Sequence, residues 1–195
     1  MRIVVLAGGL STEREVSISS GTLVAEALRS KGHEVVLLDV FMGYEENICD
    51  IDALFKQNYS FTDGNSIGDD VENTITNIKE AKENRLDKTS RYIGRNVIEI
   101  CAEADITFLA LHGGEGENGQ LQATLDLFGI KYTGSGYLGS ALAMNKGLTK
   151  SVFMQKNINT PSGELYKNEK DALAWNMFRA SLSLLGRFKR GCFKG

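Results

Sequence analysis

The chain alternates strand-like and helix-like segments from its first residues, and this alternation limits the fold more than any other feature. Residues 3–7 form a continuous aliphatic run of strand length, and residues 35–40, which begin with the aliphatic run 35–38, form a second strand-like segment. Between them apolar side chains recur at helical spacing up to Lys31, and Gly32 follows as the expected left-handed residue after a helix. Strands that are apolar throughout are typical of parallel sheets covered on both faces. The sequence therefore predicts an α/β fold with right-handed crossovers.

The same alternation returns in the second half of the chain. Asn96 is predicted to cap a short helix, and residues 106–111 form another buried-type strand. The next helix is predicted to end at Gly129, and residues 130–133 to form a short strand. Because parallel strands of an open sheet bind ligands at their carboxyl ends, the loops that follow these strands are the candidate binding loops.

Two further segments depart from this rhythm. The polar segment 44–96 is predicted to be a surface insertion, with one helical pattern at Val71, Ile75 and Ile78. A longer helix is predicted from about residue 138 to residue 156. No internal repeat is present.

Charge, hydropathy and cysteine usage exclude several classes of function. The net charge of −3 offers no basic surface for nucleic acid, so no nucleic-acid partner is expected. The longest aliphatic runs are far shorter than the ~20 residues of a membrane-spanning helix, so no membrane partner is expected. Cys49, Cys101 and Cys192 are odd in number and widely separated, which favours reduced thiols in the cytoplasm over a disulfide framework or a zinc site. Small-molecule chemistry is the remaining expectation.

The first glycine-rich loop combines close backbone approach with acidic side chains. Residues 8–9 are glycines, and the following helix start offers free N–H groups that suit a phosphate or a carboxylate. The dinucleotide fingerprint, however, needs a third glycine where this chain has residues 11–14. Glu13 and Glu15 would repel a pyrophosphate and suit the ammonium group of a zwitterion. Equally, both acids would complement the helix dipole in the first turn, and the sequence leaves the two interpretations open.

The second loop, residues 112–119, begins with a histidine directly after a buried strand. His112 is suited to donate a hydrogen bond to a carboxylate or to transfer a proton. For an isolated histidine the alternative, a structural ring bonded to loop carbonyls, is favoured. Glu115 and Glu117 match no calcium loop and are expected to hold the loop and cap the next helix. An acid-bearing loop beside a histidine-bearing loop makes an amino-acid pocket the leading hypothesis, while Asp39 is interpreted as a turn residue.

Three ordered blocks carry a resemblance to a known family. They are GGLSTEREVSISSG at residues 8–21, ALHGGEGENGQLQ at residues 110–122 and GIKYTGSGYLGSALAMNKGLTK at residues 129–150. Together they resemble the amino-terminal part of the D-alanine–D-alanine ligase family, including its D-alanine–D-serine ligase relatives. The resemblance covers roughly residues 1–167. These are ATP-grasp enzymes of peptidoglycan precursor synthesis.

The resemblance implies a fold and a reaction. Residues 1–137 would form a preATP-grasp, Rossmann-like parallel sheet with helices on both faces, and residues 138–175 would begin an ATP-grasp domain. The family uses ATP to phosphorylate the carboxylate of one D-alanine, and the amine of a second attacks the acyl phosphate to release phosphate and the dipeptide. D-alanine and ATP with Mg²⁺, a homodimer and a cytoplasmic location are implied in the same way.

The resemblance also assigns roles to individual residues. Glu13 would bind the ammonium group of the first D-alanine, and Ser17 would hold the surrounding hydrogen bonds. His112 would help to place the carboxylate of the same substrate, with support from Glu117. Lys146 would contact the nucleotide phosphates.

The end of the sequence departs from the family pattern. Residues 176–195 contain five basic residues and no acid, and the family's phosphate loop and magnesium ligands do not follow Asn176. We therefore expect a truncated chain with a frameshifted basic tail, inactive alone. The alternative is a D-amino-acid-binding or regulatory module without ligase activity. A nucleotide-binding oxidoreductase is disfavoured by the missing third glycine.

Overall fold

The computed structural model describes residues 1–48, 50–61 and 71–161, with only the backbone for residues 71–77. The chain divides into two compact units, residues 1–145 and a second unit that begins at Lys146. The sheet, the hydrophobic clusters and both glycine-rich loops belong to the first unit. No helix among the described residues is both long and apolar enough to cross a membrane.

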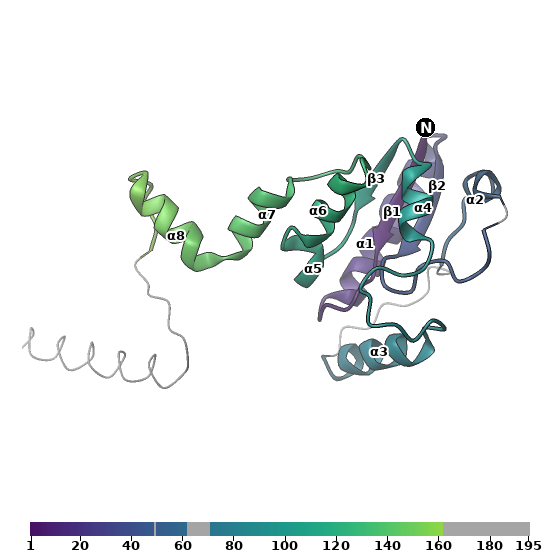
Figure 1. The fold of residues 1–195 in the computed structure, drawn as a ribbon, viewed down its shortest axis with the longest axis horizontal. Helices are drawn as coiled ribbons and strands as arrows, with labels where there is room; N and C mark the ends of the chain where they lie inside the picture. Colours follow the sequence, from purple (N-terminus) through teal and green to yellow (C-terminus); the bar gives the residue numbers. More distant parts are fainter. Residues whose placement is uncertain (49, 62–70, 162–195) are drawn as a thin grey trace, which may run out of the picture. The chain divides into compact units, whose positions relative to one another are not determined.

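The centre of the first unit is a parallel sheet, which confirms the predicted α/β class. Its strands are β1 (Arg2–Ala7), β2 (Glu34–Asp39) and β3 (Ile106–Leu109), in the order β2-β1-β3 (Figure 1). β1 is therefore the middle strand and pairs in parallel with both neighbours. As a result, the loops that follow β1 and β3 leave the sheet side by side.

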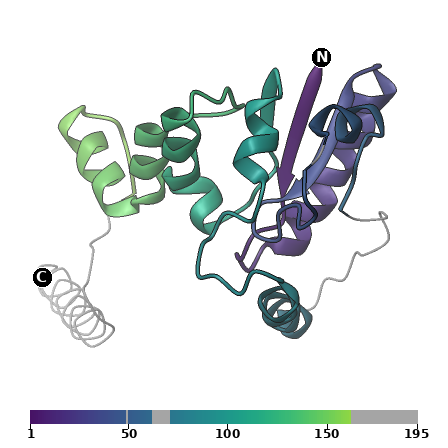
Figure 2. The same ribbon diagram turned by 45° about the vertical axis from the view of Figure 1, so that its right-hand side comes forward.

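Helices cover both faces of this sheet. One face packs against α1 (Arg14–Ser30), through a cluster that includes alternate residues of β1 and β2. The opposite face packs against α2 (Ile51–Lys56), α4 (Val97–Ala102) and α6 (Gln120–Leu127), as Figures 1 and 2 show. Because successive strand residues point to opposite faces, β1 and β2 supply both clusters, which is why their central residues are continuously apolar.

Two glycines determine how α1 packs and ends. A Cβ built on Gly21 would lie 2.6 Å from the Cβ of Ala7, so the helix approaches β1 more closely than any larger residue would allow. Gly32 follows the helix with φ of +81°. The His33 N–H donates to the Leu28 carbonyl at 3.3 Å, as in a Schellman motif. The predicted helix end at Gly32 is confirmed.

The polar segment contributes to the core as well as to the surface. Leu54 and Phe55 of α2 are buried against the sheet, and Ser60 forms a bridge with Leu37 of β2. The predicted helical pattern lies in α3 (Val71–Asn84). The segment therefore differs from a pure surface insertion, since its few apolar residues are spaced to face the sheet.

Asn96 does not cap α4 as predicted. It occupies the position before the helix, but its backbone is left-handed, with φ of 65°, and its side chain makes no capping bond. Instead its Nδ2 donates to the carbonyls of Tyr44 (2.7 Å) and Glu46 (2.9 Å). The residue thereby ties the start of the polar segment to the start of α4.

The strand predicted over residues 130–133 is reduced to a single bridge between Thr107 and Tyr132. At this point the hydroxyl of Thr133 accepts the Leu109 N–H at 3.1 Å, so a side chain replaces the next main-chain bond of the ladder. β3 is also shorter than the predicted 106–111, although Ala110 still donates to β1.

The helix predicted over residues 138–156 is two helices, α7 (Tyr137–Met144) and α8 (Lys146–Gln155). Asn145 breaks them, with φ of −90° and ψ of 87°, outside the helical region. The division between the two compact units falls at the same residue.

Candidate functional site

The two glycine-rich loops meet at the carboxyl edge of β1 and β3. The Ser11 hydroxyl donates to the His112 carbonyl at 2.5 Å, and the Glu13 N–H donates to Ser11 Oγ at 3.0 Å. A Cβ built on Gly113 would lie 3.0 Å from Glu13 Oε2. The first loop is thus bonded to the second, and the Glu13 carboxylate lies beside the backbone that follows His112.

Ser17, on the buried face of α1, is hydrogen-bonded to both loops. Its side chain is fully buried on α1. Its Oγ accepts the Gly8 N–H at 2.9 Å and donates to the Ala110 carbonyl at 2.8 Å. One hydroxyl therefore joins the end of β1, the start of α1 and the residue that follows β3.

A buried ion pair lies beneath the first loop. Arg14 Nη2 is 2.5 Å from Asp39 Oδ2, and both side chains are almost inaccessible to solvent. Arg14 Nη1 also donates to the Gly9 carbonyl at 2.7 Å, while Asp39 Oδ1 accepts the Phe41 N–H at 2.8 Å. At Gly8, which has φ of +73°, a Cβ would come within 2.3 Å of the Asp39 carboxylate. This loop therefore needs glycine for both conformation and space.

The pair changes how the charged residues of the first loop are interpreted. Asp39 was expected to be a turn residue, and it does bond to the turn after β2, but it is also the counter-ion of Arg14. The only sequence signal for this pair is weak: Asp39 ends a strand at the same sheet edge as the first loop. With Arg14 neutralised, Glu13 is the exposed charge of the loop.

Glu13 and Glu15 occupy different positions at the start of α1. Glu15 lies in the first helical turn, where an acid complements the helix dipole. Glu13 is the residue before the helix, and its side chain makes no capping bond. Its carboxylate reaches the second loop instead, which favours the ligand interpretation for Glu13 and the dipole interpretation for Glu15.

His112 is held at both its backbone and its ring. Its carbonyl accepts from Ser11, and its Nε2 lies 3.2 Å from Ser20 Oγ on α1. The ring is half-buried. The partner of the ring is a hydroxyl on the neighbouring helix, so the interpretation as a ring bonded to loop carbonyls does not describe this contact.

The other predicted site residues lie elsewhere. Glu117 is exposed at the end of the short helix α5 (Gly114–Glu117). Lys146 is exposed at the start of α8 and belongs to the second compact unit, whereas Glu13 and His112 belong to the first. The structure therefore brings together Glu13, Ser17 and His112 of the predicted set.

Tyr92 is a site residue that the sequence did not indicate. A Cβ built on Gly9 would lie 2.6 Å from its hydroxyl, which is hydrogen-bonded to the Leu10 backbone. Burial raises the pKa of the Tyr92 phenol well above its ordinary value, and the nearby carboxylates of Glu115 and Asp39 raise it further. The neutral phenol therefore packs against the first loop at Gly9 and Leu10.

Tyr92 reaches this place because Arg85 organises the segment that carries it. The Arg85 guanidinium is buried 4.5 Å over the ring of Phe41 and forms an ion pair of 2.7 Å with Asp87. It also donates to the carbonyls of Arg91 and Ile93, on either side of Tyr92. No motif marks these contacts in a polar segment, so pattern analysis had no signal for them.

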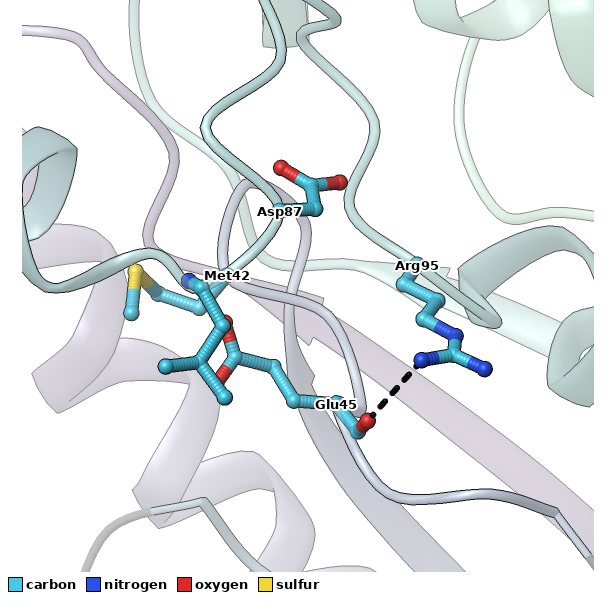
Figure 3. A pocket seen from close by; sticks show the side chains of 5 residues that line it. Met42, Glu45, Asp87 and Arg95 are labelled. Carbon is cyan, nitrogen blue, oxygen red and sulfur yellow. Dashed lines mark hydrogen bonds between the residues drawn. The ribbon is translucent and has the colours of Figure 1, made fainter.

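Two hollows of the surface are lined in part by members of the two buried-arginine ion pairs, Asp87 in one and Arg14 in the other. One of about 200 Å³ is shown in Figure 3, where Arg95 donates to the Glu45 carbonyl at 3.5 Å. Another, of about 300 Å³, is lined in part by Arg14 and Glu15. Neither hollow is lined by Glu13 or His112. The candidate site is the sheet edge at which the two loops meet.

The described residues offer no magnesium site. In the ranges that the structure describes, no group of three or more His, Cys, Asp or Glu side chains is placed to hold a metal ion. Cys101 is buried, and burial raises the pKa of its thiol to about 12. It is therefore a core residue, not a nucleophile or a metal ligand.

A parallel sheet with an acid-bearing loop and a histidine-bearing loop at the ends of adjacent strands defines a ligand-binding α/β domain. The family model described as "D-ala D-ala ligase N-terminus" matches residues 2–135. The chain belongs to the D-alanine–D-alanine ligase family, which confirms the resemblance.

Individual relatives agree with this assignment. The chain is 46% identical over 161 residues to a D-alanine–D-alanine ligase of Pediococcus pentosaceus, covering 82% of this chain and 44% of the relative. For the enzyme of Lacticaseibacillus casei the identity is 43% over 169 residues, covering 87% and 46%. A crystal structure of D-alanine–D-alanine ligase from Bacillus anthracis complexed with ATP gives a TM-score of 0.52 at 26% identity, covering 89% of this chain and 43% of that one. The chain thus spans less than half the length of the relatives it matches.

Proposed function

We propose that the chain provides the first-substrate part of a ligase that joins two D-amino acids with ATP through an acyl phosphate, in peptidoglycan precursor synthesis. The family supports this activity, since the relatives are named D-alanine–D-alanine ligases and a structural neighbour was solved with ATP.

D-alanine is a zwitterion, so a receptor for it needs opposite partners for its two ends. In this proposal Glu13 receives the ammonium group and His112 donates to the carboxylate. The observation that supports the pairing is the contact between the loops: Glu13 Oε2 lies 3.0 Å from the Cβ position of Gly113, which follows His112. A carboxylate and an imidazole on two loops that contact each other suit the two ends of a small amino acid better than a nucleotide.

The other predicted residues have supporting roles in the proposal. Ser17 keeps the two loops in register through its bonds to Gly8 and Ala110. Glu117 supports the histidine-bearing loop, and Lys146 contacts the phosphates of ATP. No step is assigned to Mg²⁺, because the described residues do not fit a magnesium site.

Calorimetric titration with D-alanine tests the roles of Glu13 and His112. Glu13→Gln keeps the size of the side chain but removes the charge that pairs with the ammonium group. We expect the Kd to rise roughly tenfold or more, as for the loss of a charge-assisted hydrogen bond. His112→Gln should weaken binding in the same direction. Glu26→Gln is the matched control, because Glu26 is an exposed acid of the same helix.

Unchanged affinity in Glu13→Gln, with the circular dichroism spectrum of the parent chain, would remove Glu13 from the site. L-alanine is a second control for the ligand. Equal affinity for both enantiomers would argue against a site shaped for a D-amino acid.

Turnover separates the ligase from a second candidate, a D-amino-acid-binding or regulatory module. The observation that favours the module is that Glu13, Ser17 and His112 all lie in the first compact unit, where the described residues offer no magnesium site. We expect binding of D-alanine without phosphate release when ATP, Mg²⁺ and D-alanine are supplied to this chain alone. Phosphate release at a steady rate would overturn this expectation, and comparison of D-serine with D-alanine would then define the second substrate. Sedimentation equilibrium tests the proposed homodimer.

A further inference from the structure

The contact between Ser20 and His112 has a consequence for the chemistry of the imidazole ring. Ser20 lies on α1 one turn beyond Ser17, and its Oγ is 3.2 Å from His112 Nε2. Either atom could donate in principle, because a hydroxyl both donates and accepts and a neutral ring has one N–H and one lone pair. The surroundings of Ser20 decide which atom donates.

The Ser20 hydroxyl has only one proton, and a second partner takes it. Ser20 Oγ lies 2.6 Å from the Val16 carbonyl, one helical turn earlier. A carbonyl can only accept, and this distance is short for an O–H···O bond, so the proton lies between Ser20 and Val16. Ser20 then offers only lone pairs to the ring. His112 Nε2 must therefore carry the N–H.

We propose that Ser20 is a positioning residue that holds His112 in its Nε2–H tautomer, so that Nδ1 carries the lone pair of the neutral ring. The role rests on the proposed function, in which His112 meets the substrate carboxylate. A carboxylate only accepts hydrogen bonds, and Nε2–H is already donated to Ser20, so the carboxylate is met at Nδ1, which donates when the ring carries a second proton. Ser20 thus determines which ring nitrogen is left for the substrate, namely Nδ1.

The backbone of His112 is also held, by a residue of the first loop. Ser11 donates to the His112 carbonyl at 2.5 Å, while Ser20 accepts from the ring. Backbone and ring are therefore both held by the Ser11–Ser20 stretch of the sequence. Ring orientation and tautomer are set before any ligand binds, as second partners of functional histidines commonly achieve.

Nitrogen-15 NMR of the histidine rings tests the proposal in the unliganded full chain. The sequence has two histidines, so His33 is an internal reference and His112→Gln assigns the second set of signals. Long-range ¹H–¹⁵N correlations distinguish the two tautomers directly. We expect a pure Nε2–H pattern for His112 in the parent chain. Ser20→Ala should shift both ring nitrogens toward a mixture of tautomers, while Ser20→Thr, which retains a hydroxyl, should preserve the pattern.

An Nδ1–H pattern for His112 in the parent chain would overturn the proposal, and so would ring signals that do not change in Ser20→Ala. Unchanged His33 signals establish that Ser20→Ala is folded. If that variant fails to fold, the pattern of the parent chain and of Ser20→Thr still decides the tautomer.

D-alanine titration of the same variants separates this inference from the proposed function. We expect Ser20→Ala to raise the Kd roughly three- to tenfold, the effect of one hydrogen bond, and Ser20→Thr to remain near the parent. Equal affinity in parent and Ser20→Ala, with altered tautomer signals, would show that the tautomer does not serve binding and would overturn the positioning role. Absence of binding in the parent chain would reject the proposed function, while the NMR pattern would still decide the tautomer.

Discussion

At the scale of single residues, neighbours in the first loop have opposite environments. Arg14 is buried and paired with Asp39, whereas Glu13 is exposed and reaches the second loop. A sequence pattern cannot assign these environments, because both residues are charged and adjacent at a helix start. The decisive information is the partner, Asp39, which is contributed by another strand.

Replacement of Arg14 by Met should destabilise the protein by roughly 3–5 kcal/mol, because Asp39 would remain charged and buried without its counter-ion. Urea denaturation of the two chains measures this loss. The double variant Arg14→Met with Asp39→Asn should be more stable than Arg14→Met alone, since asparagine keeps an acceptor for the turn without the charge. Arg95→Met, at an exposed arginine, is the control and should change stability by about 0.5 kcal/mol or less.

The phenol of Tyr92 makes stability sensitive to alkaline pH. Its pKa is raised in the folded protein above the ordinary 10.0, so the unfolded chain loses this proton first as the pH rises. The contribution of the protonated Tyr92 phenol to the free energy of unfolding is fully present below pH 10 and is lost at higher pH. Tyr92→Phe should therefore cost roughly 1 kcal/mol near neutrality through the lost hydrogen bond, but show a shallower loss of stability above pH 10.

Urea midpoints measured from pH 7 to above pH 10 give the dependence of stability on pH for the parent chain and for Tyr92→Phe. The exposed Tyr137, replaced by Phe, is the matched control. Cys101, whose pKa is also raised, contributes a loss of the same sign in every variant. Identical slopes for parent and Tyr92→Phe would show that the phenol is not held neutral by the fold.

At the scale of elements, the close approach of α1 to β1 fixes the geometry of the site. Gly21 faces Ala7 and Ala110, and one turn earlier Ser17 bonds to the end of both strands. The small side chains let the helix lie close enough for its hydroxyl to reach two backbones. Packing and site geometry are thus properties of the same helix face.

Gly21→Ala should destabilise the protein by roughly 1–3 kcal/mol through overpacking, although alanine is the better helix former by about 1 kcal/mol. The added Cβ would lie 2.6 Å from that of Ala7 and push the helix away from the sheet. Gly139→Ala in α7 is the matched control, because its nearest neighbour would be 4.0 Å away, and it should be neutral or stabilising. Thermal unfolding of both variants compares them, and equal midpoints would contradict the packing argument.

Sequence patterns predicted those elements that local signals and burial specify together. The strand at residues 2–7, the helix end at Gly32 and the helix after the second loop follow from aliphatic runs and glycine positions. The predictions for Asn96, as a helix cap, and for Asn145, as a residue inside a helix, were wrong. Both residues have non-helical backbone conformations that asparagine tolerates but that its presence in a sequence does not predict. At the candidate site, the position of the two loops at the sheet edge was predictable from strand ends and glycines, whereas the position of Tyr92 depends on long-range packing around Arg85.

At the scale of the whole molecule, the hydrophobic core lies in the first compact unit. The buried apolar residues among those described extend from Ile3 to Ile130, and both clusters lie within these limits. The second unit, which begins at Lys146, carries no buried residue in α8. We therefore expect the first unit to fold and remain stable without the second unit.

A shortened chain ending at Asn145 should keep cooperative unfolding, with a free energy of unfolding within about 1 kcal/mol of the full chain, because both clusters remain intact. A chain ending at Gly119 is the control, since it removes Leu121 and Leu125, which are buried in the core. That chain should lose its cooperative transition in urea. Loss of cooperativity in both chains would show that the second unit is required for folding.

The hydroxyl of Ser17 joins the ends of two strands through hydrogen bonds within the protein. The conformational entropy of bringing these loops together is consequently lost once, during folding, and not again at each encounter with a ligand. Association should then approach that of a rigid receptor, with little heat-capacity change from loop ordering. A ligand as small as a single amino acid makes few contacts, and it can still bind because no entropy is lost in ordering the two loops on binding.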